Sequence, residues 1–87
     1  MCIEAMIWAW DQPLSNTHDK FVLIALADGA FHDGSVDIKF DKLRHVTALS
    51  SDEIQQSIAR LMAAGHLCRD AVKNPPFEYY MPFEGAV

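Results

Sequence analysis

The spacing of apolar positions in the second half of the chain predicts two helices joined by a tight turn. Ile54, Ile58 and Leu61 follow one another at intervals of four and three, which places them on one face of a helix predicted over residues 51–64. The preceding segment, residues 40–46, also has apolar positions three apart and is predicted to be helical. The residues between the two segments break both patterns, so the chain is expected to turn there.

Capping residues mark both ends of the second helix. Ser50 is a favourable N-cap, and Glu53 three residues later has the spacing of a capping box. Gly65 stands where a residue that ends a helix in the left-handed conformation is expected. Leu49, in the turn, is expected to pack between the two helices and hold their crossing angle. Residues 40–65 therefore have the layout of a helix-turn-helix.

The rest of the chain predicts one further helix and a few short strands. Residues 17–30 are apolar on nearly every side, so this helix, with Thr17 as its expected N-cap, should form the centre of the core. Residues 2–10 are predicted to form a short strand or an irregular packed arm. Strands are predicted at residues 36–38, 67–72 and 77–83, with a turn at 73–76 between the last two.

Three helices followed by a hairpin define the expected fold. The chain has 87 residues, of which 51% are hydrophobic, enough for one domain with one core. We therefore predict a single domain over residues 1–87 that is mainly α, with a small β-hairpin wing at about 67–83. This is the architecture of a winged helix-turn-helix, with the helix-turn-helix at about 40–65.

Composition also bears on the compartment. No apolar run approaches the length of a membrane span, and residues 1–4 lack the basic start of a signal peptide. Cys2 and Cys68 need no disulfide between them in a chain with this much apolar content. We expect a cytoplasmic protein without a membrane partner.

Three segments carry motifs that occur together in one family. Residues 4–14 place a tryptophan–alanine pair ahead of a short linker, and residues 19–28 place a lysine ahead of an apolar run. Residues 47–67 contain the turn, the second helix and its stop. In these features the chain resembles the helix-turn-helix domains of phage and prophage replication-initiator-like proteins. The resemblance implies that the second helix enters the major groove of double-stranded DNA, in transcription regulation or in replication.

The chain departs from the family's pattern at three places. Ala48 stands in the turn where the family usually has glycine, and a non-glycine residue in the left-handed conformation carries a modest strain. Asp52 and Glu53 put two acids in the first turn of a helix that commonly opens with basic or polar residues. Residues 35–40 replace the family's usual start of the preceding helix. The second helix therefore begins with negative charge.

The charge distribution permits DNA binding without demanding it. The net charge is −5, which argues against a strong electrostatic attraction to phosphates. However, residues 36–73 hold six basic and five acidic residues, so the half that would read DNA is near neutral. Most of the excess of acidic over basic residues lies before residue 36, in the part of the chain that would support the DNA-reading half.

Candidate DNA contacts fall into two groups. Glutamine side chains on the second helix suit adenine edges, and basic side chains around it suit phosphates, although each such residue is also common on an ordinary solvated helix. Arg60 has the further alternative of pairing with Gln56 or with an acid one turn away. The predicted base contacts are Ser51, Gln55 and Gln56, and the predicted phosphate contacts are Lys42, Arg44, Arg60 and Lys73.

A second hypothesis is an acidic protein-interaction module on the same scaffold, because a fold does not fix a function. Such a module would suit a phage-encoded inhibitor of a host protein or of a nucleic-acid-binding complex. Two acids at the start of the second helix and an outward-facing tyrosine of the last strand would serve it, and the latter would also suit a homodimer. The candidate partner-binding residues are Asp52, Glu53, Tyr79 and Tyr80.

Enzymatic chemistry is not expected. The chain has no glycine-rich phosphate loop, dinucleotide fingerprint or nucleophile elbow. Its four histidines are scattered, and His66 with Cys68 supplies only two ligands of the four that a closed zinc site needs. We therefore predict no catalytic residue, no metal site and no cofactor.

Overall fold

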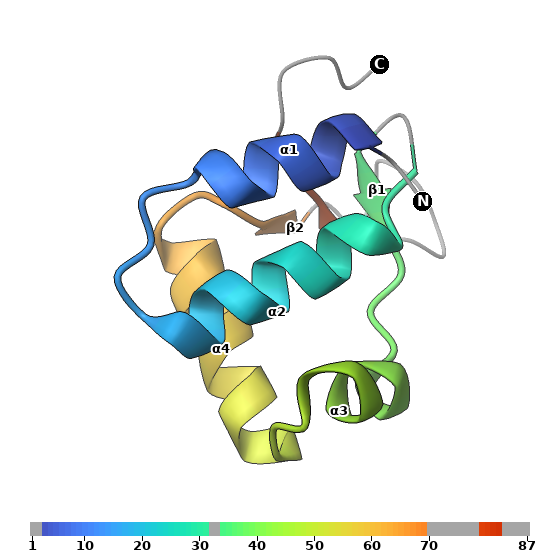
Figure 1. Ribbon diagram of the computed structural model, residues 1–87, viewed down its shortest axis with the longest axis vertical. Coiled ribbons are helices and arrows are strands. Elements are labelled where there is room, and N and C mark those ends of the chain that lie inside the picture. The colour runs from blue at the N-terminus through green and yellow to red at the C-terminus, as the bar shows by residue number, and fades with distance from the viewer. Residues whose placement is uncertain (1–2, 32–33, 70–78, 83–87) are drawn as a thin grey trace.

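The computed structural model describes residues 3–31, 34–69 and 79–82. The protein is mainly helical, with a small three-stranded antiparallel sheet (Figure 1). The elements in chain order are α1 (Ile3–Asp11), α2 (Thr17–Asp28), β1 (Ser35–Val36), α3 (Phe40–Thr47), α4 (Ser51–Ala63), β2 (Cys68–Arg69) and β3 (Tyr79–Tyr80). Among the described residues, no helix combines the length and the apolar character needed to cross a membrane.

Helix α2 is the centre of the fold, as its apolar sequence predicts. It packs against α1, α3 and α4, and in Figure 1 it lies between α1 and α3. Val22 and Leu23 are fully buried because α2 has helices on several sides. The helix starts one residue after Asn16, so the prediction of Thr17 as the N-cap is wrong. The side-chain oxygen of Asn16 accepts hydrogen bonds from the backbone N–H groups of His18 at 2.9 Å and Asp19 at 3.3 Å.

The N-terminal segment is a helix, and the prediction of a strand or an irregular arm at residues 2–10 is wrong for residues 3–10. Ala5 and Ala9 lie four positions apart and are fully buried where α1 packs against α2. Small side chains at this spacing let two helices approach closely. Large apolar residues of α1 lie on another side of the helix and are exposed, namely Ile3, Ile7 and Trp10. Packing of one helix on another decides the conformation here, over the strand preference of isoleucine and tryptophan.

The turn between α3 and α4 contains a residue in the left-handed conformation, at the position where the family named above usually has glycine. Ala48 has φ 61° and ψ 18°, in the left-handed region, and its N–H donates to the carbonyl of Arg44 at 2.9 Å. The hydroxyl of Thr47 donates to the carbonyl of Leu43 at 2.6 Å, and its oxygen accepts from the N–H of Leu49 at 3.3 Å. These bonds end α3 and fix the direction in which the chain leaves it.

The predicted capping box of α4 is confirmed. The N–H of Ser50 donates to Oε1 of Glu53 at 3.0 Å, and the N–H of Glu53 donates to Oγ of Ser50 at 3.2 Å. At the other end Gly65 has φ +83°, as predicted for the residue that ends the helix. Leu49 is half-buried against the core, as expected for the turn.

The sheet has the order β1-β3-β2, so the last strand lies between the other two. Tyr80 is opposite Ser35 on one side and opposite Cys68 on the other. The predicted antiparallel pairing of the last two strands is confirmed, although the described strands are shorter than predicted. Participation of β1 was not predicted, and the turn at 73–76 lies outside the described residues.

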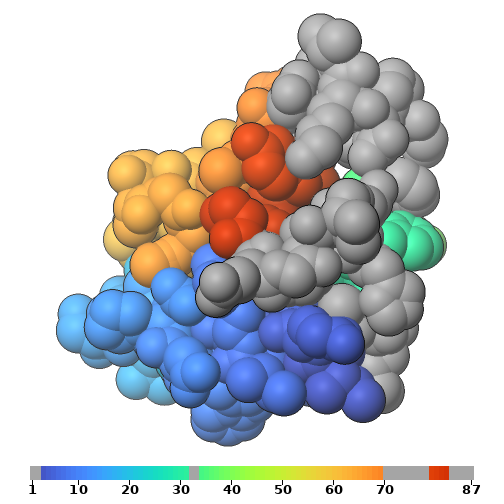
Figure 2. Space-filling view, turned by 90° about the horizontal axis from the view of Figure 1, so that it is seen from above, coloured from blue at the N-terminus to red at the C-terminus, as the bar shows by residue number. Residues whose placement is uncertain are grey.

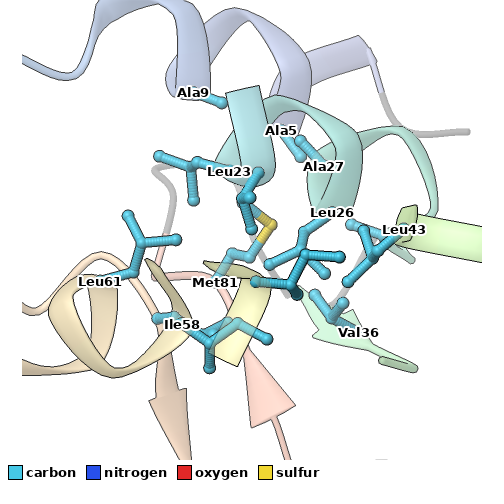
Figure 3. Close-up of a cluster of buried hydrophobic side chains, with 14 residues drawn as sticks. Ala5, Ala9, Leu23, Leu26, Ala27, Val36, Leu43, Ile58, Leu61 and Met81 are labelled. Atoms are coloured by element: carbon cyan, nitrogen blue, oxygen red, sulfur yellow. The ribbon is translucent and has the colours of Figure 1, made fainter. Parts of the chain in front are cut away.

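The core gathers side chains from every helix and from the sheet. Figure 3 shows Leu23 and Leu26 of α2, Leu61 of α4 and Val36 of β1 around Met81, which is fully buried. This single cluster fixes α3 and α4 against α2 and thereby sets the surface that α4 presents to solvent.

Candidate nucleic-acid interface

The outer face of α4 is the surface on which the predicted base contacts lie. Gln55 and Gln56 are exposed, whereas Ile54 and Ile58 on the opposite face are buried. Ser51, one turn before Gln55, is half-buried on the same side of the helix. The structure therefore brings the three predicted base contacts together on the first two turns of α4.

Helix α3 supplies the predicted phosphate contacts Lys42 and Arg44, and the two differ in their partners. The guanidinium of Arg44 pairs with the carboxylate of Asp41, three residues earlier, and both side chains are at least half exposed. Lys42 is exposed and forms no ion pair within the described part of the chain. An exposed pair one turn apart on a helix contributes only about 0.3–0.5 kcal/mol, so it leaves Arg44 free to exchange its partner.

Arg60 has a partner that the sequence did not predict. Its Nε lies 3.0 Å from each carboxylate oxygen of Asp19, and its Nη2 lies 2.8 Å from Oδ1. The same Nη2 donates to the hydroxyl oxygen of Ser57 at 3.3 Å. The Asp19 side chain is only 7% exposed, so this pair ties α4 to the first turn of α2 rather than leaving the guanidinium for a phosphate.

The ionisation of this pair follows from its hydrogen bonds. Burial raises the pKa of the Asp19 carboxyl, but the hydrogen bonds of Arg60 and Ser57 and the charge of Arg60 together hold that pKa below its ordinary value. The hydrogen bond to Asp19 raises the pKa of Arg60 above its ordinary value. Both groups are therefore charged at neutral pH.

The two acids at the start of α4 have different surroundings. Glu53 belongs to the capping box, and the backbone N–H and hydroxyl of Ser50 lower the pKa of its carboxyl. Its Oε2 also lies 3.7 Å from Nδ1 of His18, at the start of α2. Asp52 is exposed. Unlike Glu53, Asp52 forms no ion pair with a described residue.

The tyrosines of the alternative interaction surface are both half-buried in β3. Tyr79 packs against the core, and the guanidinium carbon of Arg69 lies 5.8 Å from the centre of its ring. The sequence predicted that one of the two tyrosines faces outward, and the structure shows that neither ring is fully exposed. Lys73, the remaining predicted phosphate contact, lies outside the described residues.

A stripe of exposed apolar side chains on α1 was not predicted. Ile3, Ile7 and Trp10 are 63%, 57% and 63% exposed, and their spacing of four and three puts them on one side of the helix. Figure 2 looks onto the molecule from the side of α1, whose blue surface lies along the lower part of the view. The helical spacing of these three residues is the signal in the sequence that would have revealed both the helix and the stripe.

Two apolar hollows lie beside α2. One, of about 210 Å³, is bordered by α1, α2 and α3, and the other, of about 380 Å³, lies between the end of α1 and the start of α2. Phe21 and Ile24 line both. No residue of α4 lines either hollow, so they are separate from the face that carries Gln55 and Gln56.

Metal-binding side chains do not gather in the described ranges 3–31, 34–69 and 79–82, where no group of three His, Cys, Asp or Glu residues is close enough to hold an ion. His66 has a buried Nε2 without a hydrogen-bond partner, and its ring lies edge-on to Trp8 at 6.0 Å between centres. Cys68 is half-buried with a free thiol. His66 and Cys68 are the two candidate ligands that, from the sequence, are too few for a zinc site.

Neither a protein-family model nor a curated protein nor a solved structure matches the chain. The assignment of function therefore depends on the geometry and chemistry of the surfaces described above.

Proposed function

We propose that the protein is a small winged-helix DNA-binding module of phage or prophage type, with a regulatory or replication-related role. The observation that carries the proposal is the α3–turn–α4 unit, whose second helix is buried on one face and presents Gln55 and Gln56 on the other. In helix-turn-helix proteins the N-terminal part of the second helix contacts base edges in the major groove. Glutamine can form a paired hydrogen bond with adenine there.

The ion pairs of the basic residues support different roles for Lys42, Arg44 and Arg60. In the described part of the chain, Lys42 forms no ion pair, and Arg44 pairs with the exposed Asp41. We assign phosphate binding to these two residues. Arg60 instead positions α4 through Asp19. With two phosphates neutralised, the logarithm of affinity should fall with the logarithm of salt concentration with a slope of about −2.

The proposal is tested by titrating a labelled random-sequence duplex with the full chain across a salt series. Arg44→Gln should weaken binding and reduce the slope by about one, because one phosphate contact is lost. Asp52→Asn should strengthen binding, because it removes a negative charge beside the bases. Asp11→Asn, on α1, is the matched control for a change in net charge and should leave affinity unchanged.

Two outcomes would contradict DNA binding by α4. One is the absence of binding at the lowest salt concentration to both random duplex and a selected-sequence pool. The other is an equal gain for Asp52→Asn and Asp11→Asn, which would show that overall charge governs the interaction.

A second candidate function, a protein-interaction module, is favoured by the stripe on α1. Ile3, Ile7 and Trp10 leave more apolar surface on one short helix than an isolated domain needs, and such patches mark contacts with other proteins. Ile7→Glu would disrupt this contact without touching the core. If analytical ultracentrifugation shows a dimer that Ile7→Glu converts to a monomer, the partner is a second copy. A monomeric wild-type chain would exclude the homodimer.

A further inference from the structure

The smaller hollow is an apolar recess with charged residues in its lining. It has a volume of about 210 Å³ and is enclosed by side chains of α1, α2 and α3, including Phe21, Ile24 and Val46. Phe21 and Val46 remain 46% and 47% exposed, so the recess opens to solvent. Ligand pockets for drug-sized molecules usually measure roughly 300–1,000 Å³, so this recess suits a smaller ligand.

Four charged residues line the recess, and two of them have no ion-pair partner among residues 3–31, 34–69 and 79–82. Lys39 pairs with Asp37 at 3.7 Å. Asp28, at the end of α2, and Lys42, on α3, form no ion pair with each other or with any other described residue. The recess therefore presents one uncompensated negative group and one uncompensated positive group beside an apolar surface.

The place of Lys42 is fixed by the end of α2. A Cβ added at Gly29, the residue that caps α2, would lie 3.9 Å from the Lys42 ammonium. The ammonium thus sits close to the backbone that follows Asp28, and the side chain crosses from α3 to α2. Asp28 and Lys42 therefore line the same recess and come from two different helices.

We propose that this recess binds a free apolar α-amino acid. The α-ammonium group contacts the carboxylate of Asp28, the α-carboxylate contacts the ammonium of Lys42, and the apolar side chain enters the recess. Charge-assisted hydrogen bonds of this kind are stronger than neutral ones, and two of opposite sign fix the orientation of the ligand. The ligand would also cover Phe21 and Val46.

Other small ligands match the recess less well. A purely apolar molecule leaves both charged groups without a partner, and a simple carboxylate faces the uncompensated charge of Asp28. A peptide carries its ammonium and carboxylate at opposite ends, whereas Asp28 and Lys42 line one recess. A zwitterion with an apolar body satisfies both charges and the apolar lining together.

Such a ligand would bridge α2 and α3. Because it contacts a residue of each helix, it stabilises their packing, and its effect on unfolding grows with the ratio of ligand concentration to dissociation constant. This inference shares Lys42 with the proposed DNA surface, whereas Asp28 and the apolar lining belong to the recess alone. Its test uses no DNA, so its failure and the failure of DNA binding are distinguishable.

The test is isothermal titration of the full chain with L-leucine and L-phenylalanine, each compared with its methyl ester and its N-acetyl derivative. The free amino acid should bind at least tenfold more tightly than either derivative, because each derivative lacks one charge. Lys42→Gln should remove the preference over the ester, and Asp28→Asn should remove the preference over the N-acetyl compound. Arg44→Gln and Asp52→Asn, outside the recess, should bind as the wild type does.

The outcomes are distinguishable from a folding defect. Thermal unfolding of each variant without ligand establishes that it is folded, and Val46→Phe, which fills the recess, provides a variant that keeps both charges and should lose binding. Absence of saturable binding for both amino acids would overturn the proposal. So would equal binding of the amino acid, its ester and its N-acetyl derivative to the wild-type chain.

Discussion

Arg60 of α4 donates three hydrogen bonds to the carboxylate of Asp19 in α2, although the two residues are 41 positions apart. The carboxylate is buried, and the guanidinium reaches it from a side chain that is 46% exposed. This contact joins the central helix to the helix proposed to read DNA, and it fixes the last turn of α4 relative to the first turn of α2. It is therefore a positioning contact for the surface that carries the glutamines.

Removal of the charge at Asp19 should destabilise the fold measurably. Asp19→Asn keeps the size of the side chain and loses its charge, and hydrogen bonds to charged groups contribute roughly 1.5–3 kcal/mol when buried. We expect a loss of about 1–2 kcal/mol in the free energy of unfolding, because water reaches the Arg60 side of the pair. Urea denaturation measures it. Asp41→Asn, which breaks the exposed pair with Arg44, should cause no measurable change, and an equal loss in both variants would contradict this interpretation.

The pair between Asp19 and Arg60 makes the free energy of unfolding depend on pH in the acidic range. Because the pKa of Asp19 is lowered in the folded protein, the unfolded chain takes up the proton first as the pH falls below the ordinary value of 3.8. Stability contributed by the carboxylate is complete above that value and is lost as the pH passes down through the lowered native pKa. Urea denaturation of the wild type and Asp19→Asn should show a difference that is largest at neutral pH and narrows in acid. Both chains retain Glu53, so its own lowered pKa cancels from the difference.

Glycine at position 48 should stabilise the protein. Ala48 has φ 61°, which costs an L-residue roughly 1–2 kcal/mol, and glycine avoids this cost while losing some entropy from the unfolded chain. We expect Ala48→Gly to raise the free energy of unfolding by about 0.5–1 kcal/mol. Ala59→Gly, in the regular and exposed part of α4, should lower it by a similar amount. Thermal or urea unfolding of the two variants should therefore shift in opposite directions, and shifts of the same sign would contradict the assigned turn.

The capping box should contribute to stability through Ser50. Ser50→Ala removes the hydroxyl that accepts from the N–H of Glu53, and loss of such a cap costs about 1 kcal/mol. Ser51→Ala, one position later and inside the helix, keeps the capping box intact and should change stability little. The ratio of the two effects, measured by urea denaturation, distinguishes a true N-cap from a general preference for serine at the start of the helix.

The parts of the fold that were predicted correctly depend on local signals. The turn at Ala48, the cap at Ser50 and the stop at Gly65 are each set by residues within one helical turn, so the sequence alone places α3 and α4. The helix α1 was missed because its buried positions are the small residues Ala5 and Ala9, which carry little hydrophobic signal. Asn16 was missed as the cap of α2 although asparagine is favoured there.

The candidate site was predictable only in part, for a physical reason. Gln55 and Gln56 are placed outward by the same periodicity that buries Ile54 and Ile58. The partner of Arg60 depends on a tertiary contact between residues 41 positions apart, for which no local spacing gives a signal. The recess beside α2 likewise depends on how three helices meet, and the two charges in its lining that have no ion-pair partner in the described part of the chain are brought together only by folding.

The strand order β1-β3-β2 determines when the protein can finish folding during synthesis. In this order β1 and β2 have no strand neighbour until β3 is present, and Met81, whose N–H donates to the carbonyl of Gly34 at 2.8 Å, closes the core. Helices α1 to α4 can form early because the backbone hydrogen bonds within each helix are local. The sheet must wait for residues 79–81, so a nascent chain that ends before them exposes Leu23, Leu61 and their neighbours to chaperones and proteases.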